Sequence, residues 1–495
     1  MKALAVALGV IAGCADNTIT VSPIIDVPAN DSASAFPLDQ LVLSVAEAGS
    51  SADLVSQTFA KGSQVSLPGV PFGNDLVIHM TGRVGSSEIA YGRTCAISIT
   101  ADAPAPQPHL FFAREVKFAD LDLTLQPEAR QDGIAITDVA GAGLILGGHT
   151  PGAMTPNGEI ERFDPLTGEL RLLASPPEVT PRSGAVAAQL GTGGDTRIAL
   201  IGGADTNGNG ATFIELVEPD APSGRRVDRV DDAQMARTML TATALTDGRV
   251  IAIGGLAAGT PSNAVDEVTI ANGTATVRVL RAMLVHPRYA HTATRLGADV
   301  GAPVLVAGGL DGASPVPQPI ATSELFKPLS EDISPTFKPD MIYARSAHQA
   351  VRMPDGSVLI IGGVGYFDPK GLIGPPDAIG PVPSLELFTL DAGFTDVGKL
   401  PTNAGLTGFA ATPLPDGRVL LTGGRTADGT VTDTAFIARL DPIDGSVDVV
   451  ATDHMSVPRA GHSATLLCDG TIFISGGTTD PAPAERYNPP ALDRR

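Results

Sequence analysis

Three histidines stand at the same offset in repeated segments, an arrangement that could bring ligands to a metal. His291, His348 and His462 each lie three residues after an arginine. Neutral imidazole is a common metal ligand. These histidines, however, belong to three separate segments, and an imidazole can equally make a structural hydrogen bond. We therefore favour structural hydrogen bonding over a metal site.

A second candidate for metal binding is the segment "ADTNGNGATFIE". Its Asp205, Asn207 and Asn209 alternate as oxygen ligands do in calcium loops. The glutamate that closes such a loop is missing, because the twelfth position is Leu216 and Glu215 falls one residue short. An Asn-Gly-rich turn is the commoner explanation of this pattern. Calcium is therefore the weaker interpretation, and no cofactor is predicted.

Short catalytic motifs are absent from the chain. It has no HExxH, no GxSxG, no P-loop lysine and no CxxC. These motifs place a metal, a nucleophile, a phosphate-binding backbone or a redox pair where its chemistry needs it. No catalytic residue is therefore predicted.

The three cysteines have different settings. Cys14 ends an N-terminal apolar run, Cys95 alternates with Ile97 and Ile99 as a core residue of a strand would, and Cys468 precedes an Asp-Gly turn. An oxidising compartment would permit a disulfide between Cys95 and Cys468. Two free thiols, one of them buried, are the favoured interpretation.

These candidates belong to a repeat that is marked by glycine pairs. Glycine tolerates positive φ and close approach of neighbouring backbone. Each pair closes a short apolar strand such as "VLII", often after an Asp-Gly turn, which is a strong hairpin signal. The doublet is therefore predicted to end a strand in a crowded turn. Seven doublets recur every 52 to 61 residues, at 147/148, 202/203, 254/255, 308/309, 362/363, 423/424 and 476/477.

Charged residues flank the doublets in a fixed order. An arginine opens the strand before the turn, and a Glu-x-Phe/Tyr segment follows the doublet. This order resembles the kelch repeat over most of residues 109–495, and the resemblance implies four-stranded blades of a β-propeller. The chain departs from the family because it lacks tryptophan and has "LTGFAATPL" where the sixth arginine would stand. We expect the arginines to form salt bridges between blades with Glu161, Glu324, Glu386 and Glu485.

The ends of the repeat region predict how the propeller closes. Only six residues follow Pro489, too few for a fourth strand in the last repeat, whereas residues 109–123 have a strand pattern ahead of the first repeat. We expect this segment to supply the missing strand, so that no sheet edge is left open. Seven doublets imply seven blades.

Composition and patterning extend this interpretation to the whole chain. Aromatic residues make up only 4% and there are 56 glycines and 41 prolines, which favours many short strands and turns. Residues 36–102 resemble a small immunoglobulin-like or transthyretin-like β-sandwich, and 103–108 read as a Pro-rich linker. The predicted fold class is all-β: a small β-sandwich followed by a seven-bladed kelch β-propeller over 109–495.

The N-terminus predicts the compartment. Residues 1–13 have the pattern of a short secretory signal that ends at Cys14. This segment resembles the lipobox of bacterial lipoproteins, which implies that Cys14 is acylated, that 14–35 form a tether, and that the lipid anchors the protein in a membrane. Ala15 after the anchor implies the outer membrane of a Gram-negative cell, facing the periplasm or the surface. The alternative is a conventional signal peptide with an incidental cysteine.

Charge and loop length predict the kind of partner. The net charge of −21 disfavours nucleic acid. The long loop after the fifth doublet carries Tyr366 and Phe367, and strand topology places it on one face with the arginine-led entrances, including Arg345 and Arg288. Such a face is typical of binding sites. We expect a monomer that binds a protein or glycan. The alternative is a propeller enzyme, either carbohydrate-active or a copper oxidase resembling galactose oxidase.

Overall fold

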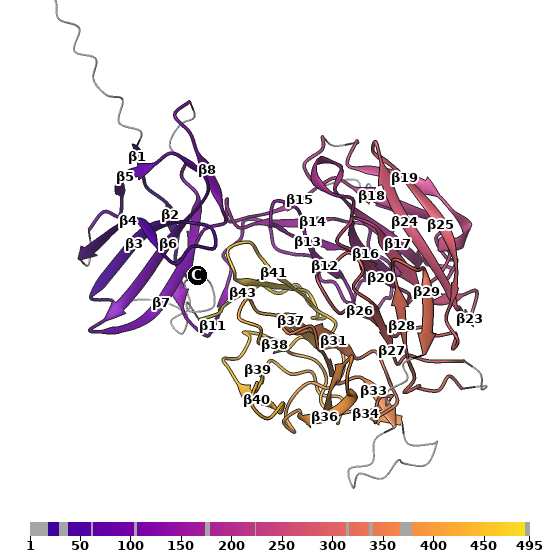
Figure 1. The fold of residues 1–495 in the computed structure, drawn as a ribbon. Helices are drawn as coiled ribbons and strands as arrows, with labels where there is room; N and C mark the ends of the chain where they lie inside the picture. The colour runs from indigo at the N-terminus through magenta and orange to yellow at the C-terminus, as the bar shows by residue number, and fades with distance from the viewer. Residues whose placement is uncertain are drawn as a thin grey trace, which may run out of the picture.

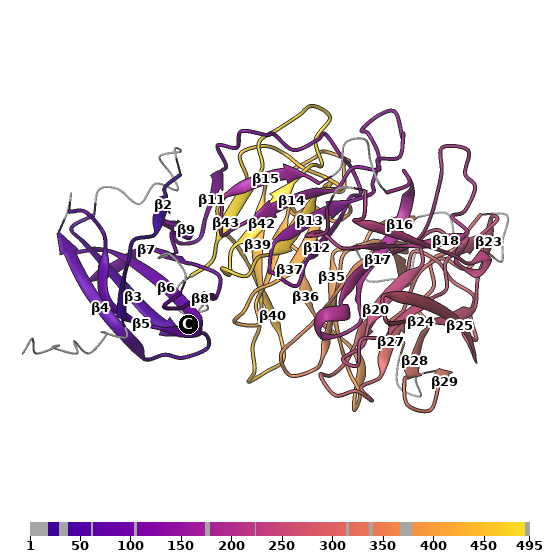
Figure 2. The ribbon, with the colours of Figure 1, turned by 90° about the horizontal axis from the view of Figure 1, so that it is seen from above.

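The structure is a computed structural model that describes residues 18–28, 38–60, 63–102, 106–173, 179–222, 224–312, 316–335, 340–366 and 379–490. Its regular elements are strands, apart from two three-residue 3-10 helices, η1 (Gly193–Asp195) and η2 (Ala233–Met235). Figures 1 and 2 show a small N-terminal β domain beside a larger propeller. The predicted all-β fold is confirmed. Within the described residues, no helix is long and apolar enough to cross a membrane.

The N-terminal domain is built on one six-stranded sheet with the order β10-β7-β6-β3-β4, in which β8 also pairs with β6. Two strand pairs, β1 with β5 and β2 with β9, contribute to the same hydrophobic core. Successive side chains of a strand point to opposite faces, so Leu41, Leu43 and Val45 all reach this core. The strands are β1 (Thr18–Val21), β2 (Ile24–Asp26), β3 (Gln40–Glu47), β4 (Asp53–Ala60), β5 (Leu67–Pro71), β6 (Gly73–Val84), β7 (Ser87–Arg93), β8 (Ile97–Ile99), β9 (His109–Phe111) and β10 (Ala113–Arg114).

This domain takes in segments that were predicted to lie outside it. Strands β1 and β2 fall in the predicted tether 14–35, and β9 and β10 fall in the predicted closing strand 109–123. Val21 and Leu110 are fully buried in the domain core. The prediction from residues 36–102 missed these strands because β1 and β2 precede that segment in the sequence and β9 and β10 follow it.

The propeller contains seven four-stranded antiparallel sheets within the described residues. The innermost strands of neighbouring sheets contact each other in a ring that closes between β12 and β41. Hydrophobic cores lie between adjacent blades, as where Ile251 and Ile253 meet Val304 and Val306. Blades 1 to 3 are β12 (Ile134–Thr137), β13 (Gly143–Leu146), β14 (Glu161–Asp164), β15 (Glu169–Leu172); β16 (Ser183–Leu190), β17 (Arg197–Ala204), β18 (Phe213–Val217), β19 (Val227–Asp231); and β20 (Thr241–Ala244), β21 (Val250–Ile253), β24 (Ala264–Ala271), β25 (Thr274–Met283).

Three of the remaining blades keep the same order from the innermost to the outermost strand, and the last one is completed from upstream. Blades 4 to 6 are β26 (Thr292–Arg295), β27 (Val304–Ala307), β28 (Ser323–Lys327), β29 (Asp332–Pro335); β31 (Gln349–Arg352), β32 (Val358–Ile361), β35 (Ser384–Thr389), β36 (Gly393–Lys399); and β37 (Ala410–Pro413), β38 (Val419–Thr422), β39 (Ala435–Leu440), β40 (Val447–Ala451). Blade 7 combines β41 (Ser463–Leu466), β42 (Ile472–Ser475) and β43 (Glu485–Asn488) with β11 (Lys117–Asp120).

Blade 7 thus joins the two ends of the propeller. Strand β11 pairs antiparallel with β43, with Phe118 opposite Tyr487. Both side chains are buried, and their ring centres lie 4.8 Å apart. Of the segment 109–123, only 117–120 form the outer strand of the blade, because β9 and β10 pair with the N-terminal domain.

The glycine doublets join each blade to the next. The first glycine of each doublet has φ between +58° and +73°, and the second between +74° and +101°. A Cβ on Gly308 would lie 2.5 Å from the carbonyl oxygen of Arg345 in the next blade. The amide of Gly309 donates to that same oxygen at 2.9 Å. The predicted need for positive φ and close backbone approach is therefore confirmed.

The two domains are linked covalently by a disulfide between Cys95 and Cys468, whose Cα atoms are 5.0 Å apart. The expectation of two free thiols is wrong. Cys468 lies in the turn between the first and second strands of blade 7, and Cys95 lies beside this turn. The side chain of Asn488 adds to this junction by donating to the carbonyl oxygens of Tyr91 and Ala113 at 3.1 and 2.8 Å.

Candidate functional site

The repeated arginines are buried inside the blades. Arg345 and Arg288 have no exposed side-chain surface and pair with Glu386 at 2.5 Å and Glu324 at 2.8 Å. Arg345 also donates to the carbonyl oxygen of Gly362, the first glycine of its own doublet, at 3.0 Å. Each pair lies within one blade and not between blades as expected. The prediction that Arg288 and Arg345 contact a ligand is corrected, because their guanidinium groups already serve blade packing.

The sixth blade shows what replaces this ion pair. Leu406 occupies the arginine position, since its carbonyl oxygen accepts from the amide of Gly363 as the arginine carbonyls do in other blades. Phe436 occupies the glutamate position, because it pairs with Leu421, the residue two positions before the doublet, as Glu386 pairs with Ile360 in blade 5. Phe409 occupies the histidine position, and all three side chains are buried in one cluster. A buried ion pair and an apolar set therefore both fit the same place in the fold.

The repeated histidines make hydrogen bonds between blades. Nε2 of His348 lies 2.9 Å from the Thr292 hydroxyl, and Nε2 of His462 lies 2.8 Å from the Thr422 hydroxyl. His291 makes the same contact with Thr241 at 3.1 Å. The structural interpretation is confirmed. Among the residues that the structure describes, no three or more His, Cys, Asp or Glu side chains gather where they could hold a metal ion.

The burial of His348 and His462 predicts that the protein loses stability in acid. Burial, and then the charge of the neighbouring arginine, lowers the pKa of His348 and of His462 to about 3. An unfolded histidine takes up a proton near pH 6.5. Between pH 6.5 and pH 3 the unfolded chain therefore binds more protons than the folded chain, and stability falls as the pH falls. Each histidine should cost roughly 2 kcal/mol of stability from neutral pH to pH 5.

We expect His348→Phe, which copies Phe409, to reduce this acid sensitivity. The measurement is the free energy of unfolding by urea at pH 7 and pH 5. His454→Phe is the control, because the side chain of His454 is 61% exposed. An equal loss between the two pH values in His348→Phe and the wild type would contradict the assignment.

The candidate calcium loop is closed by its own hydrogen bonds. Oδ1 of Asp205 accepts from the amides of Asn207 and Asn209 at 2.8 and 2.9 Å, and Oδ2 accepts from the Asn209 side-chain amide at 3.1 Å. These bonds, led by those from Asn209, lower the pKa of the Asp205 carboxyl. This is the geometry of an Asn-Gly-rich turn, the interpretation favoured from the sequence.

The end of the propeller that carries the doublets, here called the Gly-Gly face, also carries the fifth-repeat hairpin. Strand β30 (Arg345–Ser346) pairs with β33 (Val364–Tyr366), which pairs with β34 (Ile379–Pro381). The described part of this repeat, the small sheet, therefore lies on the same face as the arginine-led entrance, as strand topology predicted. Tyr366 is half-buried in this small sheet. Phe367 lies outside the described residues.

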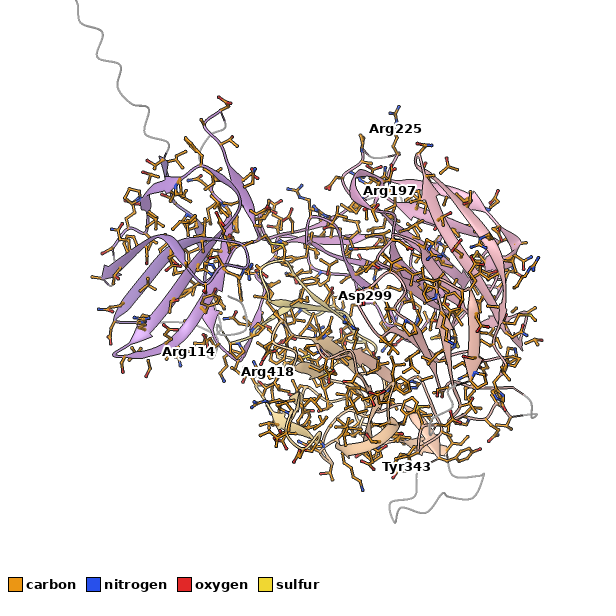
Figure 3. The ribbon with its side chains drawn as sticks, viewed as in Figure 1. Arg114, Arg197, Arg225, Asp299, Tyr343 and Arg418 are labelled. Atoms are coloured by element: carbon orange, nitrogen blue, oxygen red, sulfur yellow. A yellow bond between two sulfur atoms is a disulfide. The ribbon has the colours of Figure 1, made fainter. Side chains whose placement is uncertain are left out.

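Exposed apolar side chains lie on this hairpin and in the segment just before it. Ile342 and Ile379 are 48% and 40% exposed, although both are large hydrophobic residues. Ile379 pairs directly with Tyr366. Figure 3 places Tyr343 at the same end of the propeller. Interfaces are enriched in tyrosine, so Tyr343 and Tyr366, together with the exposed isoleucines, give this edge of the face the composition of a contact surface.

A hollow of about 470 Å³ opens on the same face. Its lining includes Gln131 from the entrance to blade 1, Arg425 after the sixth doublet, and Thr478 to Pro481 after the seventh. Arg425 is exposed, unlike the repeated arginines. Sequence reasoning missed it, although it directly follows a doublet where the other repeats have histidine, threonine or apolar residues.

Comparisons with known proteins identify the fold and not the function. No protein-family model matches the chain, and no curated protein matches its sequence. A fungal alcohol oxidase of the AA5 family, solved in complex with copper, superposes with a TM-score of 0.52 at 17% identity, covering 76% of each chain. The structure of YjhT superposes with a TM-score of 0.45 at 14% identity, covering 66% of this chain and 99% of that one. The oxidase supports a galactose-oxidase-like, kelch-like β-propeller.

The residues present do not fit a copper site of the galactose-oxidase type. That site needs a cysteine cross-linked to a tyrosine. Cys468 is the propeller's only cysteine, and its sulfur is bonded to Cys95. The buried histidines of the repeat bond to threonines, as described above.

Proposed function

We propose that this protein is an extracytoplasmic binding or scaffold protein that recognises a protein or glycan partner through its Gly-Gly face. One observation carries the proposal: the repeated arginines are paired with glutamates inside the blades, whereas exposed apolar residues and an unrepeated arginine lie on this face. Ile342, Ile379 and Arg425 are exposed there although Arg345 and Arg288 are fully buried. A rigid scaffold that presents varied loops is a common way to build a binding surface.

The compartment is supported by the link between the domains. A disulfide persists in oxidising compartments and is rare in the cytosol. The Cys95–Cys468 bond therefore agrees with the N-terminal signal pattern. Cys14 lies outside the described residues, so its acylation and an outer-membrane location are part of the proposal. The net charge of −21 supports a partner that is not a nucleic acid.

The test begins with a partner captured by the wild-type protein from a glycan array or from a cell-envelope extract. Ile342→Asp with Ile379→Asp, and separately Arg425→Glu, should then weaken binding by at least about tenfold, the effect of losing roughly 1.4 kcal/mol. A charge at an apolar contact point would be desolvated on binding without a partner. The measurement is the Kd of each variant by surface plasmon resonance.

The matched control lies on the opposite end of the propeller. Ile443 is 92% exposed in the turn between the third and fourth strands of blade 6, so Ile443→Asp makes the same chemical change away from the Gly-Gly face. We expect its affinity to equal that of the wild type. Unchanged affinity in the Gly-Gly face variants, or an equal loss in Ile443→Asp, would refute this site.

A further inference from the structure

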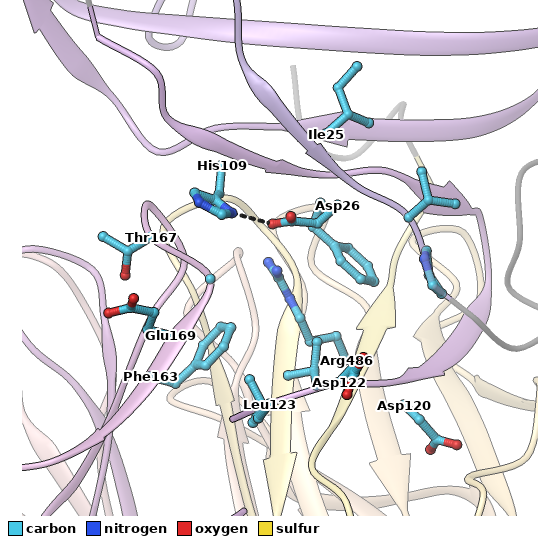
Figure 4. A pocket seen from close by; sticks show the side chains of 15 residues that line it. Ile25, Asp26, His109, Asp120, Asp122, Leu123, Phe163, Thr167, Glu169 and Arg486 are labelled. Atoms are coloured by element: carbon cyan, nitrogen blue, oxygen red, sulfur yellow. Dashed lines mark hydrogen bonds and ion pairs between the residues drawn. The ribbon is translucent and has the colours of Figure 1, made fainter. Parts of the chain in front are cut away.

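A cavity of about 480 Å³ lies between the N-terminal domain and blades 7 and 1 (Figure 4). Strands β2 and β9 form one wall. The opposite wall comes from residues 120–123 at the end of β11, from residues between 163 and 169 around the β14–β15 turn of blade 1, and from Arg486 of β43. Small-molecule sites occupy roughly 300–1,000 Å³ and occur preferentially at domain interfaces. The cavity contains none of the residues assigned above to the Gly-Gly face.

Arg486 places a hydrogen-bond donor in this cavity. Its side chain is 2% exposed, and Figure 4 shows it extending between the two walls toward Asp26. Its Nε donates to the Thr471 hydroxyl at 3.0 Å, and Nη2 donates to Thr471 and to Asp469. Its guanidinium also lies 4.2 Å from the ring centre of Phe111. The hydrogen bonds that Arg486 makes to described residues come from Nε and Nη2, so Nη1 is the nitrogen that remains to donate into the cavity.

Acceptors line the same cavity. Oδ2 of Asp26 pairs with Nδ1 of His109 at 2.8 Å, which leaves Asp26 Oδ1 and His109 Nε2 for other contacts. Asp122 is exposed beside them. Oδ1 of Asp120 is buried and, among the described residues, has no hydrogen-bond partner.

The mixture of groups selects the class of ligand. The lining combines donors with acceptors: Arg486, whose charge is paired with Asp469, stands against the carboxylates of Asp26, Asp120, Asp122 and Glu169, which disfavour an anionic ligand. A neutral hydroxyl both donates and accepts, so a polyhydroxylated molecule can satisfy both sets at once. Apolar side chains such as Leu123 supply the remaining wall. We propose that this cavity binds a neutral saccharide unit, with Arg486 Nη1 and His109 Nε2 as donors and the aspartates as acceptors.

The test fills the cavity in the full-length chain. Thr167 lines the cavity from the turn of blade 1, and Thr167→Trp should block it. Blade 6 has the same turn: the amide of Gly168 donates to Asp164 at 2.8 Å, and that of Gly445 donates to Asp441 at 3.0 Å. Asp444 is the equivalent of Thr167, so Asp444→Trp is the matched control. Asp122→Leu is a second cavity variant in case Thr167→Trp does not fold.

The probes are glucose, galactose, mannose and N-acetylglucosamine, with putrescine as the cationic and glucuronate as the anionic comparison. Binding is measured by saturation-transfer NMR and isothermal calorimetry. We expect at least one neutral sugar to bind, with affinity at least tenfold weaker in Thr167→Trp or Asp122→Leu and unchanged in Asp444→Trp. Binding of only putrescine or glucuronate, binding of no probe, or an equal loss in Asp444→Trp would overturn the assignment.

This result is independent of the proposed function. Ile342→Asp with Ile379→Asp changes only the Gly-Gly face, so sugar binding in the cavity should be unchanged in that variant. Loss of partner binding without loss of sugar binding would separate the two sites. Loss of sugar binding in that variant would overturn the cavity assignment.

Discussion

Replacing Arg345 with leucine is expected to lower the free energy of unfolding by about 3 to 5 kcal/mol, because Glu386 then stays buried without its partner. Both side chains are fully buried, and Glu386 also accepts from the amide of Ile342 at 2.6 Å. Burial already raises the pKa of the Glu386 carboxyl, and Arg345 is the main group that opposes this shift. The measurement is the midpoint of urea denaturation at pH 7.

The double variant Arg345→Leu with Glu386→Phe should recover at least half of this loss. It copies Leu406 and Phe436, the apolar pair that fills the same place in blade 6. Replacing a buried ion pair by well-packed apolar residues is often neutral or stabilising, whereas removing one partner is not. Arg439→Leu is the control, because Arg439 is exposed and should change stability by less than about 0.5 kcal/mol. A double variant no more stable than the single one would show that the ion pair is itself required.

The second large effect concerns closure of the propeller by β11. Two truncated chains, one starting at Glu115 and one at Leu121, both lack the N-terminal domain and differ only in residues 115–120, which contain β11. Both carry Cys468→Ser, because Cys95 is removed. We expect the shorter chain to lose roughly 3 kcal/mol or more, since burial of Phe118 against Tyr487 is lost and β43 becomes an open edge.

Thermal melting followed by circular dichroism, together with sedimentation to detect aggregation through the open edge, measures this difference. Equal melting temperatures and equal solubility of the two truncated chains would show that β11 does not close the ring. A full chain with Phe118→Ala provides an internal check. Its melting temperature should also fall, because Phe118 is buried in blade 7.

The repeat made the propeller predictable from sequence. Each doublet has the same φ signature as the others, so periodicity alone located the ends of the second strands. The regular offset between the arginines and the later glutamates indicated ion pairs, and the shortage of residues after Pro489 indicated a closing strand. These signals are either local or periodic in the sequence. They are independent of the contact between the two domains, so they could be found without the structure.

The remaining features depend on contacts that no local pattern reports. Cys95 and Cys468 are 373 residues apart, and their bond exists because the N-terminal domain packs against one turn of blade 7. The same packing draws β2 and β9 into one sheet and creates the cavity around Arg486. The inward orientation of Arg288 and Arg345 was missed because an arginine at a strand entrance can face solvent or its own blade. The two orientations are distinguished only by whether the fold places a buried glutamate next to the arginine, as it does here.

The most direct test of the central claim is site-specific photocrosslinking in the cells that make the protein. A benzophenone amino acid is placed at Ile342 or Ile379 on the Gly-Gly face, and at Ile443 or Val139 in turns at the opposite end, where both native residues are well exposed. The proposed function predicts a discrete adduct of higher mass from positions 342 and 379 and none from 443 and 139. Adducts from 443 or 139 alone, or the same adducts from all four positions, would contradict it.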